Sequence, residues 1–214
     1  MLHYETVTPY LRNTLMRLMA DATFDSFRLV GGTSLSLRLG HRMSIDIDLF
    51  SNAQYGDLDF HALQSHLRSM FPYCEGDCGP VPGIGATWFV GNSRDDAVKL
   101  DLFYTDDFIG EMVVEDGIRM ASIEDIIAMK LDVVARGGRK KDFWDLHELS
   151  TSHSVSQMLD LYEERYPYNY TREQVLQGFS HFEKADAEPD PMCLFLKDWD
   201  TIKRDLTKTF LGAR

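Results

Sequence analysis

Cysteine is scarce in this sequence, and the scarcity bears on how the fold is stabilised. Cys74, Cys78 and Cys193 are the three cysteines among 214 residues. The count is odd, and the chain begins without the basic and apolar segments of an export signal, so we expect reduced thiols rather than a disulfide framework. A zinc site that joins Cys74 and Cys78 to His61 or His66 is the alternative, but no second Cys-His pair accompanies them.

Long apolar runs are also absent. No uninterrupted apolar stretch approaches the ~20 residues that a membrane span requires. Hydrophobic residues nevertheless make up 44% of the chain, enough to bury a core in one domain or in a core domain with a smaller helical one. We therefore expect a globular protein that stays in the cytoplasm and does not enter a membrane.

Positive charge is in short supply. The chain has 22 Lys and Arg against 34 Asp and Glu, a formal net charge of −12, which argues against a broad nucleic-acid-binding surface. Local basic clusters can still present an RNA end, or they can be solvated helix ends. The two candidate clusters are Arg136, Arg139, Lys140 and Lys141, and, nearer the C-terminus, Lys197, Lys203, Arg204 and Lys208.

Two aspartates lie on an apolar segment that reads as a strand, residues 44–50. Side chains alternate along a strand, so Asp46 and Asp48 share one face, while Ile45, Ile47 and Leu49 fill the other. Two carboxylates this close repel each other unless a cation lies between them. Hard oxygen ligands suit Mg²⁺, which takes one or two carboxylates and accepts further ligands from substrate phosphates.

A diglycine turn precedes this strand. Residues 27–30 read as a short buried strand, and Gly31 and Gly32 then allow the backbone to approach a ligand closely. A helix follows, for which Thr33 or Ser34 is the expected cap, so that phosphate oxygens would meet free N–H groups at its start. The diglycine or the Asp pair alone would favour an ordinary structural role. Their order and spacing together favour a phosphate and metal site.

A third carboxylate is available on a neighbouring strand. Residues 87–90 and 98–104 read as an antiparallel hairpin, and in its second strand Asp101 lies opposite the apolar face, together with Lys99 and Phe103. Taken alone, an Asp on a half-exposed strand is usually solvated.

A lysine lies within the apolar face of a later helix. Ser122 opens this helix as a cap, and Lys130 falls in the middle of its apolar arc. A buried ammonium needs an anionic partner, which is either Asp145 or the phosphates of a bound nucleotide. In the next helix, Asp142 is the expected cap and Asp145 faces inward beside Leu146.

These motifs resemble the polymerase-β-like nucleotidyltransferase superfamily, most closely its abortive-infection AbiEii-type toxin branch. The resemblance covers about residues 27–149 and rests on Gly31 to Leu35, Arg42, Ser44, Asp46 to Phe50, Lys130 and Lys141 to Leu146. It implies an α+β fold with a mixed sheet, flanking helices and a C-terminal helical lobe. We expect the nucleotidyltransferase core in residues 1–120 and the helical region in residues 121–214.

The resemblance also implies the roles of individual residues. Asp101 joins Asp46 and Asp48 as a ligand of Mg²⁺, or of Mn²⁺ as the alternative ion, and helps the acceptor hydroxyl to lose its proton. Lys130 binds the triphosphate, and Asp145 positions either that lysine or the acceptor hydroxyl. The expected catalytic residues are Asp46, Asp48, Asp101, Lys130 and Asp145, and the expected nucleotide-binding residues are Gly31, Gly32, Thr33, Ser34, Arg42, Ser44, Lys130 and Asp142.

The implied activity is transfer of a nucleoside monophosphate from a nucleoside triphosphate (NTP) to a hydroxyl, with release of pyrophosphate. The resemblance implies the 3′ end of a transfer RNA (tRNA) as acceptor, and a toxin that a separately encoded antitoxin controls. Three alternatives remain: the same core with a protein or small-molecule acceptor, a phosphotransferase that moves the γ-phosphate, and a catalytically silent nucleotide-binding module.

Overall fold

The computed structural model describes residues 1–81 and 83–212, so residues 213–214 of the expected helical region lie outside the described residues. The chain forms two compact units. The first contains Met1–Arg38, Ser44–Asp107 and Met112–Ala121, and the second contains Leu39–Met43, Phe108–Glu111 and the chain from Ser122. Two short segments, 39–43 and 108–111, thus belong with the helical unit although they precede residue 121.

The first unit is built on a sheet whose seven described strands have the order β3-β4-β5-β2-β1-β7-β6. β2 runs parallel to β5, and β1 runs parallel to β7, whereas the other neighbouring pairs are antiparallel. The predicted mixed sheet is confirmed. The strands are β1 (Arg28–Leu29), β2 (Asp46–Ser51), β3 (Tyr73–Glu75), β4 (Gly85–Ser93), β5 (Asp96–Tyr104), β6 (Val113–Glu115) and β7 (Ile118–Met120).

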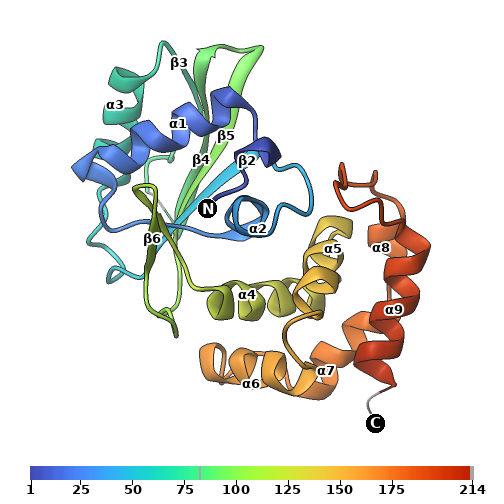
Figure 1. The fold of residues 1–214 in the computed structure, drawn as a ribbon. Helices are drawn as coiled ribbons and strands as arrows, with labels where there is room; N and C mark the ends of the chain where they lie inside the picture. Colours follow the sequence, from blue (N-terminus) through green and yellow to red (C-terminus); the bar gives the residue numbers. More distant parts are fainter. Residues whose placement is uncertain (82, 213–214) are drawn as a thin grey trace. The chain divides into compact units, whose positions relative to one another are not determined.

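Helices α1 (Pro9–Ala20) and α3 (Phe60–Met70) lie on the same face of this sheet (Figure 1). Thr8 followed by Pro9 predicts the capped start of a helix, and Thr8 does cap α1 by accepting a hydrogen bond from the Leu11 N–H (3.0 Å). Each large apolar side chain buried here contributes about 1.5–3 kcal/mol. The shared core includes Leu11, Leu15, Leu18, Leu63, Leu67, Ile47, Leu49, Trp88, Val90, Leu100 and Leu102. The opposite face of β2 and β5 carries the polar side chains.

Some element ends differ from those expected. The apolar spacing of residues 57–71 predicts an amphipathic helix that begins at Asp57, but α3 begins at Phe60, because the Asp59 side chain caps it by accepting from the Ala62 N–H (2.9 Å). The predicted hairpin of β4 and β5 is confirmed, but its link is shorter than expected. The strand pairing continues past a bulge between Gly91 and Ser93, so only two residues join the strands.

The second unit is helical. The Ser122 side chain caps α4 by accepting from the Asp125 N–H (3.0 Å), as predicted. The sequence predicts one helix over residues 172–182, and the structure instead ends α7 at Gln177 and continues with a short 3₁₀ turn. The helices are α4 (Ile123–Ala135), α5 (Lys140–Leu149), α6 (Val155–Arg165), α7 (Arg172–Gln177), α8 (Glu183–Asp186) and α9 (Trp199–Leu211).

Aromatic rings fill the centre of this helical unit. Phe143 of α5 packs against Phe179, Phe182 and Trp199, with ring centroids 4.9–6.0 Å apart. Within the described residues, no helix combines the length and apolar character needed to cross a membrane.

Candidate active site

Asp46, Asp48 and Asp101 lie on one face of the sheet. β2 alternates between half-buried and buried residues, with both aspartates half-buried and Ile47 and Leu49 buried. In the parallel pairing of β2 with β5, Asp48 lies opposite Asp101, so their side chains project from the same face. The predicted arrangement of the three carboxylates on adjacent strands is confirmed. Ile45 is a correction: it precedes the strand and is 69% exposed, rather than packed beside Ile47.

The diglycine turn lies against Asp48. Gly31 has a φ of +67°, a left-handed conformation that favours glycine. A Cβ atom placed on Gly31 would lie 2.5 Å from Asp48 Oδ2, closer than two such atoms can approach. The Val30 N–H also donates to the Asp48 carbonyl (2.9 Å). Sequence reasoning expected the turn and the carboxylate at one site, and the structure brings them together.

The hydroxyl groups of Thr33 and Ser34, which follow the turn, are not arranged as predicted. Helix α2 (Gly31–Leu39) already begins at Gly31, so neither Thr33 nor Ser34 is its cap, which corrects the prediction. The Thr33 hydroxyl contacts Ser44 Oγ (2.8 Å) and donates to the Asp46 carbonyl, so it connects α2 to the start of β2. Ser34 Oγ is buried and has no hydrogen-bond partner among the described residues. Gly32 lies in the first turn of α2, where N–H groups have no intrahelical acceptor.

Asp101 is engaged by its neighbours. Thr87 Oγ1 donates to Asp101 Oδ1 (2.6 Å), and the Lys99 ammonium lies 2.5 Å from Asp101 Oδ2. Lys99 and Thr87 were absent from the predicted site, although the alternation of the strand had placed Lys99 on the same face as Asp101. Over residues 1–81 and 83–212, no group of three or more His, Cys, Asp or Glu side chains is arranged to hold a metal ion. The metal assignment therefore stays a prediction.

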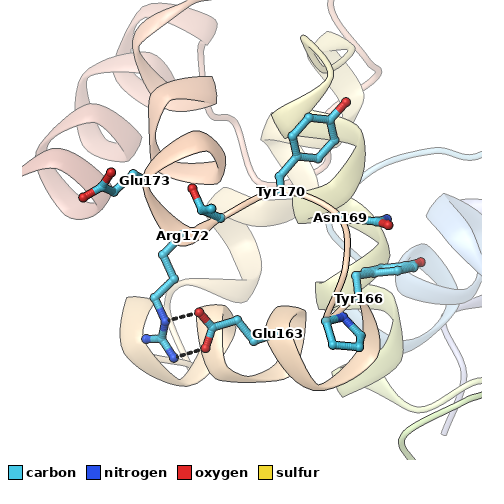
Figure 2. Close-up of a pocket in the computed structure, with 8 residues that line it drawn as sticks. Glu163, Tyr166, Asn169, Tyr170, Arg172 and Glu173 are labelled. Carbon is cyan, nitrogen blue, oxygen red and sulfur yellow. Dashed lines mark hydrogen bonds and ion pairs between the residues drawn. The ribbon is translucent and has the colours of Figure 1, made fainter.

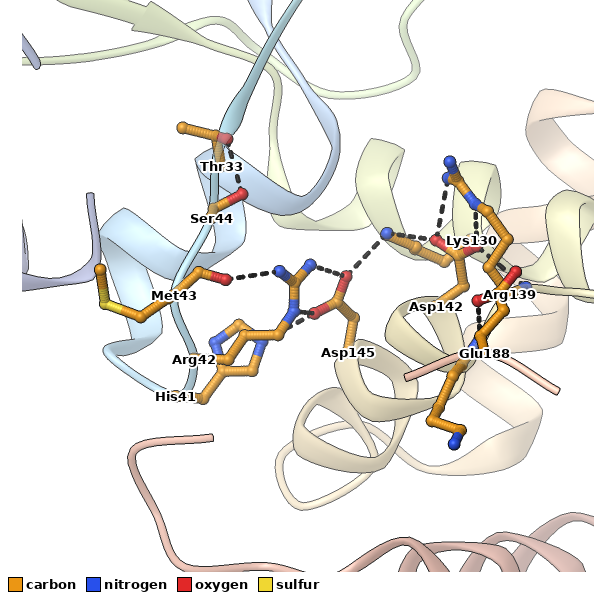
Figure 3. Close-up of polar contacts among 11 residues, drawn as sticks. Thr33, His41, Arg42, Met43, Ser44, Lys130, Arg139, Asp142, Asp145 and Glu188 are labelled. Carbon is orange, nitrogen blue, oxygen red and sulfur yellow. Dashed lines mark hydrogen bonds and ion pairs between the residues drawn. The ribbon is translucent and has the colours of Figure 1, made fainter. Parts of the chain in front are cut away.

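A second polar cluster lies inside the helical unit (Figure 3). Asp145 is buried and accepts from His41 Nε2 (2.7 Å), from Arg42 Nε (2.7 Å) and from Arg42 Nη2 (2.8 Å). The Lys130 ammonium lies 2.7 Å from Asp145 Oδ2 and 2.6 Å from Asp142 Oδ1. Asp145, one of the two partners predicted for Lys130, is confirmed, and Asp142 is an additional one.

Charge, rather than burial, decides the protonation of this cluster. Burial lowers the pKa of Lys130, but the charges of Asp142 and Asp145 outweigh it and raise that pKa above its usual value. Burial likewise raises the pKa of Asp145, yet Arg42 and Lys130 hold it well below the usual range of a carboxyl group. Within the cluster, the two cations Lys130 and Arg42 and the two carboxylates Asp142 and Asp145 thus neutralise one another.

Asp142 lies within the first turn of α5. The expected cap is wrong in position, because Arg139 is the residue before α5 and Asp142 is the third residue within it. The Asp142 carboxylate accepts from the Arg139 N–H (3.2 Å), which is one half of a capping box. His41 was missed by sequence reasoning, since nothing in its local sequence indicates a partner 104 residues away.

The first predicted basic cluster is largely neutralised within the protein. Arg136 pairs with Asp132, Arg139 with Asp142 and the buried Lys140 with Asp190. In the second cluster, Lys197 pairs with Glu148 and Lys203 with Asp186. Most of these side chains are therefore partnered rather than gathered into a basic surface.

The helical unit also contains a hollow of about 490 Å³ between α6 and α7 (Figure 2). Arg172 at its edge is held by Glu163, with Nε 2.7 Å from Glu163 Oε1. The hollow contains none of the predicted site residues, and we do not assign the active site to it. It is lined by Glu163, Tyr166, Pro167, Asn169, Tyr170, Thr171, Arg172 and Glu173.

Comparison with known proteins decides the family. Residues 13–210 match the family model described as "Nucleotidyl transferase AbiEii toxin, Type IV TA system". The chain belongs to this family. It is therefore an enzyme of the nucleotidyltransferase class and a toxin of the type IV toxin-antitoxin kind. The predicted AbiEii resemblance is confirmed.

The individual relatives share only a low sequence identity with this chain. An uncharacterised protein of Aquifex aeolicus is 26% identical over 188 residues, which span 83% of this chain and 84% of the relative. JHP933 from Helicobacter pylori is 20% identical with a TM-score of 0.59, over 96% of this chain and 92% of the other. MenT4, a nucleotidyltransferase toxin from Mycobacterium tuberculosis, is 13% identical with a TM-score of 0.57, over 94% and 82% of the two chains. The likeness to MenT4 confirms the nucleotidyltransferase fold.

Proposed function

We propose that this AbiEii-family nucleotidyltransferase moves a nucleoside monophosphate from an NTP to the 3′ end of a tRNA, with Mg²⁺ or Mn²⁺ bound by Asp46, Asp48 and Asp101. One observation carries the proposal. Asp48 lies between the Gly31 turn and the Asp101 strand, so a phosphate-binding backbone and two carboxylates lie within one site.

The chemistry of the donors suits a magnesium ion, although among the described residues these carboxylates do not form a group arranged to hold a metal. The three carboxylates offer hard oxygen ligands, and the absent Cβ of Gly31 keeps space beside Asp48 Oδ2. When bound, the ion would neutralise charge on the phosphate and on the attacking oxygen.

The protein's own groups would bind the triphosphate and take up a proton. The free N–H groups at the start of α2, at Gly31 and Gly32, bind phosphate oxygens. Asp101 accepts the proton of the attacking hydroxyl, while Thr87 and Lys99 fix the orientation of its carboxylate.

In this proposal Lys130 and Asp145 hold each other and their neighbouring side chains in place. The ammonium of Lys130 is enclosed by Asp142 and Asp145, so of the two roles predicted for Asp145, its contacts favour that of holding the lysine. Arg42 shares the same carboxylate and thereby connects the 39–43 segment to α5. Direct contact of Lys130, Arg42, Ser34 or Ser44 with the nucleotide stays a prediction.

The proposals of a tRNA acceptor and of an antitoxin partner are based on the family. Type IV toxins are paired with an antitoxin, and we propose a separately encoded one for this chain. The net charge of −12 favours the alternative of a protein or small-molecule acceptor, since RNA binding gains affinity from basic clusters.

A labelled-nucleotide assay tests the proposal. The protein would be incubated with each of the four α-labelled NTPs and with total cellular RNA, a protein extract or small-molecule acceptors in separate reactions. We expect label in the tRNA fraction and none with Asp48→Asn, while Asp57→Asn, which alters an exposed aspartate, keeps full activity. Label in the protein or small-molecule fraction instead would favour the alternative acceptor, and release of ADP from ATP would indicate a phosphotransferase.

A further inference from the structure

The first unit contains a hollow of about 580 Å³ beside the carboxylates, within the usual volume of a small-ligand site. Its residues come from β3, from β4, and from the chain that follows each of these strands. It is lined by Tyr73, Glu75, Gly76, Thr87, Phe89 and Arg94.

The strand register places this hollow on the face that carries the carboxylates. Thr87 of β4 lies opposite Asp101, and Asp101 lies opposite Asp48. The next row runs from Glu75 through Phe89, Lys99 and Asp46. Thr87 belongs both to the hollow and to the site, because its hydroxyl donates to Asp101 Oδ1. The hollow therefore adjoins Asp101 through Thr87.

The walls of the hollow have the chemistry that binds a nucleobase. Phe89 is 46% exposed in the middle of a strand, where an aromatic ring gains little from packing but can stack on a base. Tyr73 adds a second ring and donates its hydroxyl hydrogen to Glu75. The Glu75 carboxylate can also accept from the exocyclic amino group of a base. Arg94 offers a guanidinium group for a phosphate.

Gly76 lies at the edge of the hollow, where the chain after β3 packs closely against β4. Gly76 has a φ of +140°, and a Cβ on it would lie 2.5 Å from the Thr87 carbonyl oxygen and 2.8 Å from Trp88 Cδ1. The backbone after β3 therefore lies directly against β4, where any side chain would collide.

The hollow and the turn at Gly31, where we propose that the triphosphate binds, lie on opposite sides of the carboxylates. In the order β4-β5-β2-β1, Gly31 follows β1 and the hollow lies on β4, with Asp48 and Asp101 between them. In-line displacement requires the attacking hydroxyl and the leaving pyrophosphate on opposite sides of the phosphorus. If the triphosphate binds at Gly31, the attacking hydroxyl comes from the side of β4.

We propose that this hollow binds the terminal nucleobase of the acceptor RNA, stacked on Phe89, with Arg94 on the neighbouring phosphate. This inference rests on the proposed function, because it takes RNA as the acceptor. It assigns a specificity role to Phe89, Arg94 and Glu75, which the sequence motifs did not indicate.

Steady-state kinetics of the full chain test the assignment, with RNA and NTP varied separately. Phe89→Leu keeps a large apolar side chain on the strand but cannot stack, and we expect it to raise KM for the RNA about 10-fold or more. KM for the NTP should change less than about twofold. Phe89→Tyr should retain the wild-type KM for RNA. Tyr168→Ala, which removes an exposed ring from the other unit, should change neither value.

Two outcomes would overturn the assignment. An unchanged KM for RNA in Phe89→Leu would show that no base stacks there, and a raised KM for the NTP alone would place the nucleotide donor in the hollow. If the wild-type protein transfers nothing to RNA, the proposed function fails, and binding of a fluorescent single-stranded RNA oligonucleotide decides the assignment instead. Weaker binding by Phe89→Leu would then support it, and equal binding would refute it.

Discussion

The buried cluster around Asp145 gives a quantitative prediction for Asp145→Asn. The carboxylate accepts from His41, from two nitrogens of Arg42 and from Lys130, all within 2.8 Å. The amide of Asn carries no charge and directs its NH₂ group at one of these donors. Removing one partner of a buried ion pair costs about 3–5 kcal/mol. That is a large part of the roughly 5–15 kcal/mol by which a domain is stable.

Urea denaturation followed by tryptophan fluorescence measures this loss. Trp144 and Trp199 belong to the helical unit, so the signal reports mainly on the unit that contains Asp145. The matched control is Asp200→Asn, whose exposed carboxylate lies 3.4 Å from Lys203 and should leave the midpoint unchanged. A loss below about 1 kcal/mol in Asp145→Asn would contradict the reasoning, because it would be no more than one ordinary hydrogen bond contributes.

The same carboxylate predicts acid sensitivity. In the folded protein burial raises the pKa of Asp145, but the charges of Arg42 and Lys130 outweigh burial and hold this pKa well below its usual value. In an unfolded chain the pKa of an aspartate is about 3.9. The unfolded state therefore binds more protons near pH 4, and the free energy of unfolding falls as pH falls. The stabilisation that ionised Asp145 provides is fully present above about pH 5 and is lost as the pH falls below that value. Asp145→Asn should show a shallower loss between pH 5 and 3, and an unchanged slope would contradict the assignment.

Two further predictions concern the turn and the helical core. Gly31→Ala and Gly117→Ala share a positive φ and should each cost about 1–2 kcal/mol of stability. Only the first places a Cβ 2.5 Å from Asp48 Oδ2, so only Gly31→Ala should lose nucleotidyl transfer, and equal activity in both variants would refute the assigned site. Arg165→Met leaves Asp125 buried without its 2.7 Å partner and should cost about 3–5 kcal/mol in urea denaturation; a near-normal midpoint would be contrary to this.

Local patterns predicted much of the first unit. The alternation of residues in β2 and β5 placed the carboxylates on one face, and the glycines predicted the turn beside them. The caps at Thr8 and Ser122 were also predictable, because each depends on residues within one helical turn. These features arise from interactions between near neighbours in the sequence.

Long-range pairings could not be predicted in the same way. His41 and Arg42 bind a carboxylate on α5 more than 100 residues later. The assignment of segments 39–43 and 108–111 to the helical unit is of the same kind, since it depends on tertiary contacts. Lys130 is the intermediate case: its place on an apolar face predicted an anionic partner, and the structure supplied two.

The fate of the α-phosphate tests the central claim most directly. Wild-type protein and Asp48→Asn would each be incubated with purified tRNA and with NTP labelled at either the α- or the γ-phosphate. The account predicts that the wild-type protein places α-label in the tRNA and γ-label in pyrophosphate, and that the variant places label in neither. Label from the γ-phosphate in the acceptor, or equal transfer by Asp48→Asn, would contradict it.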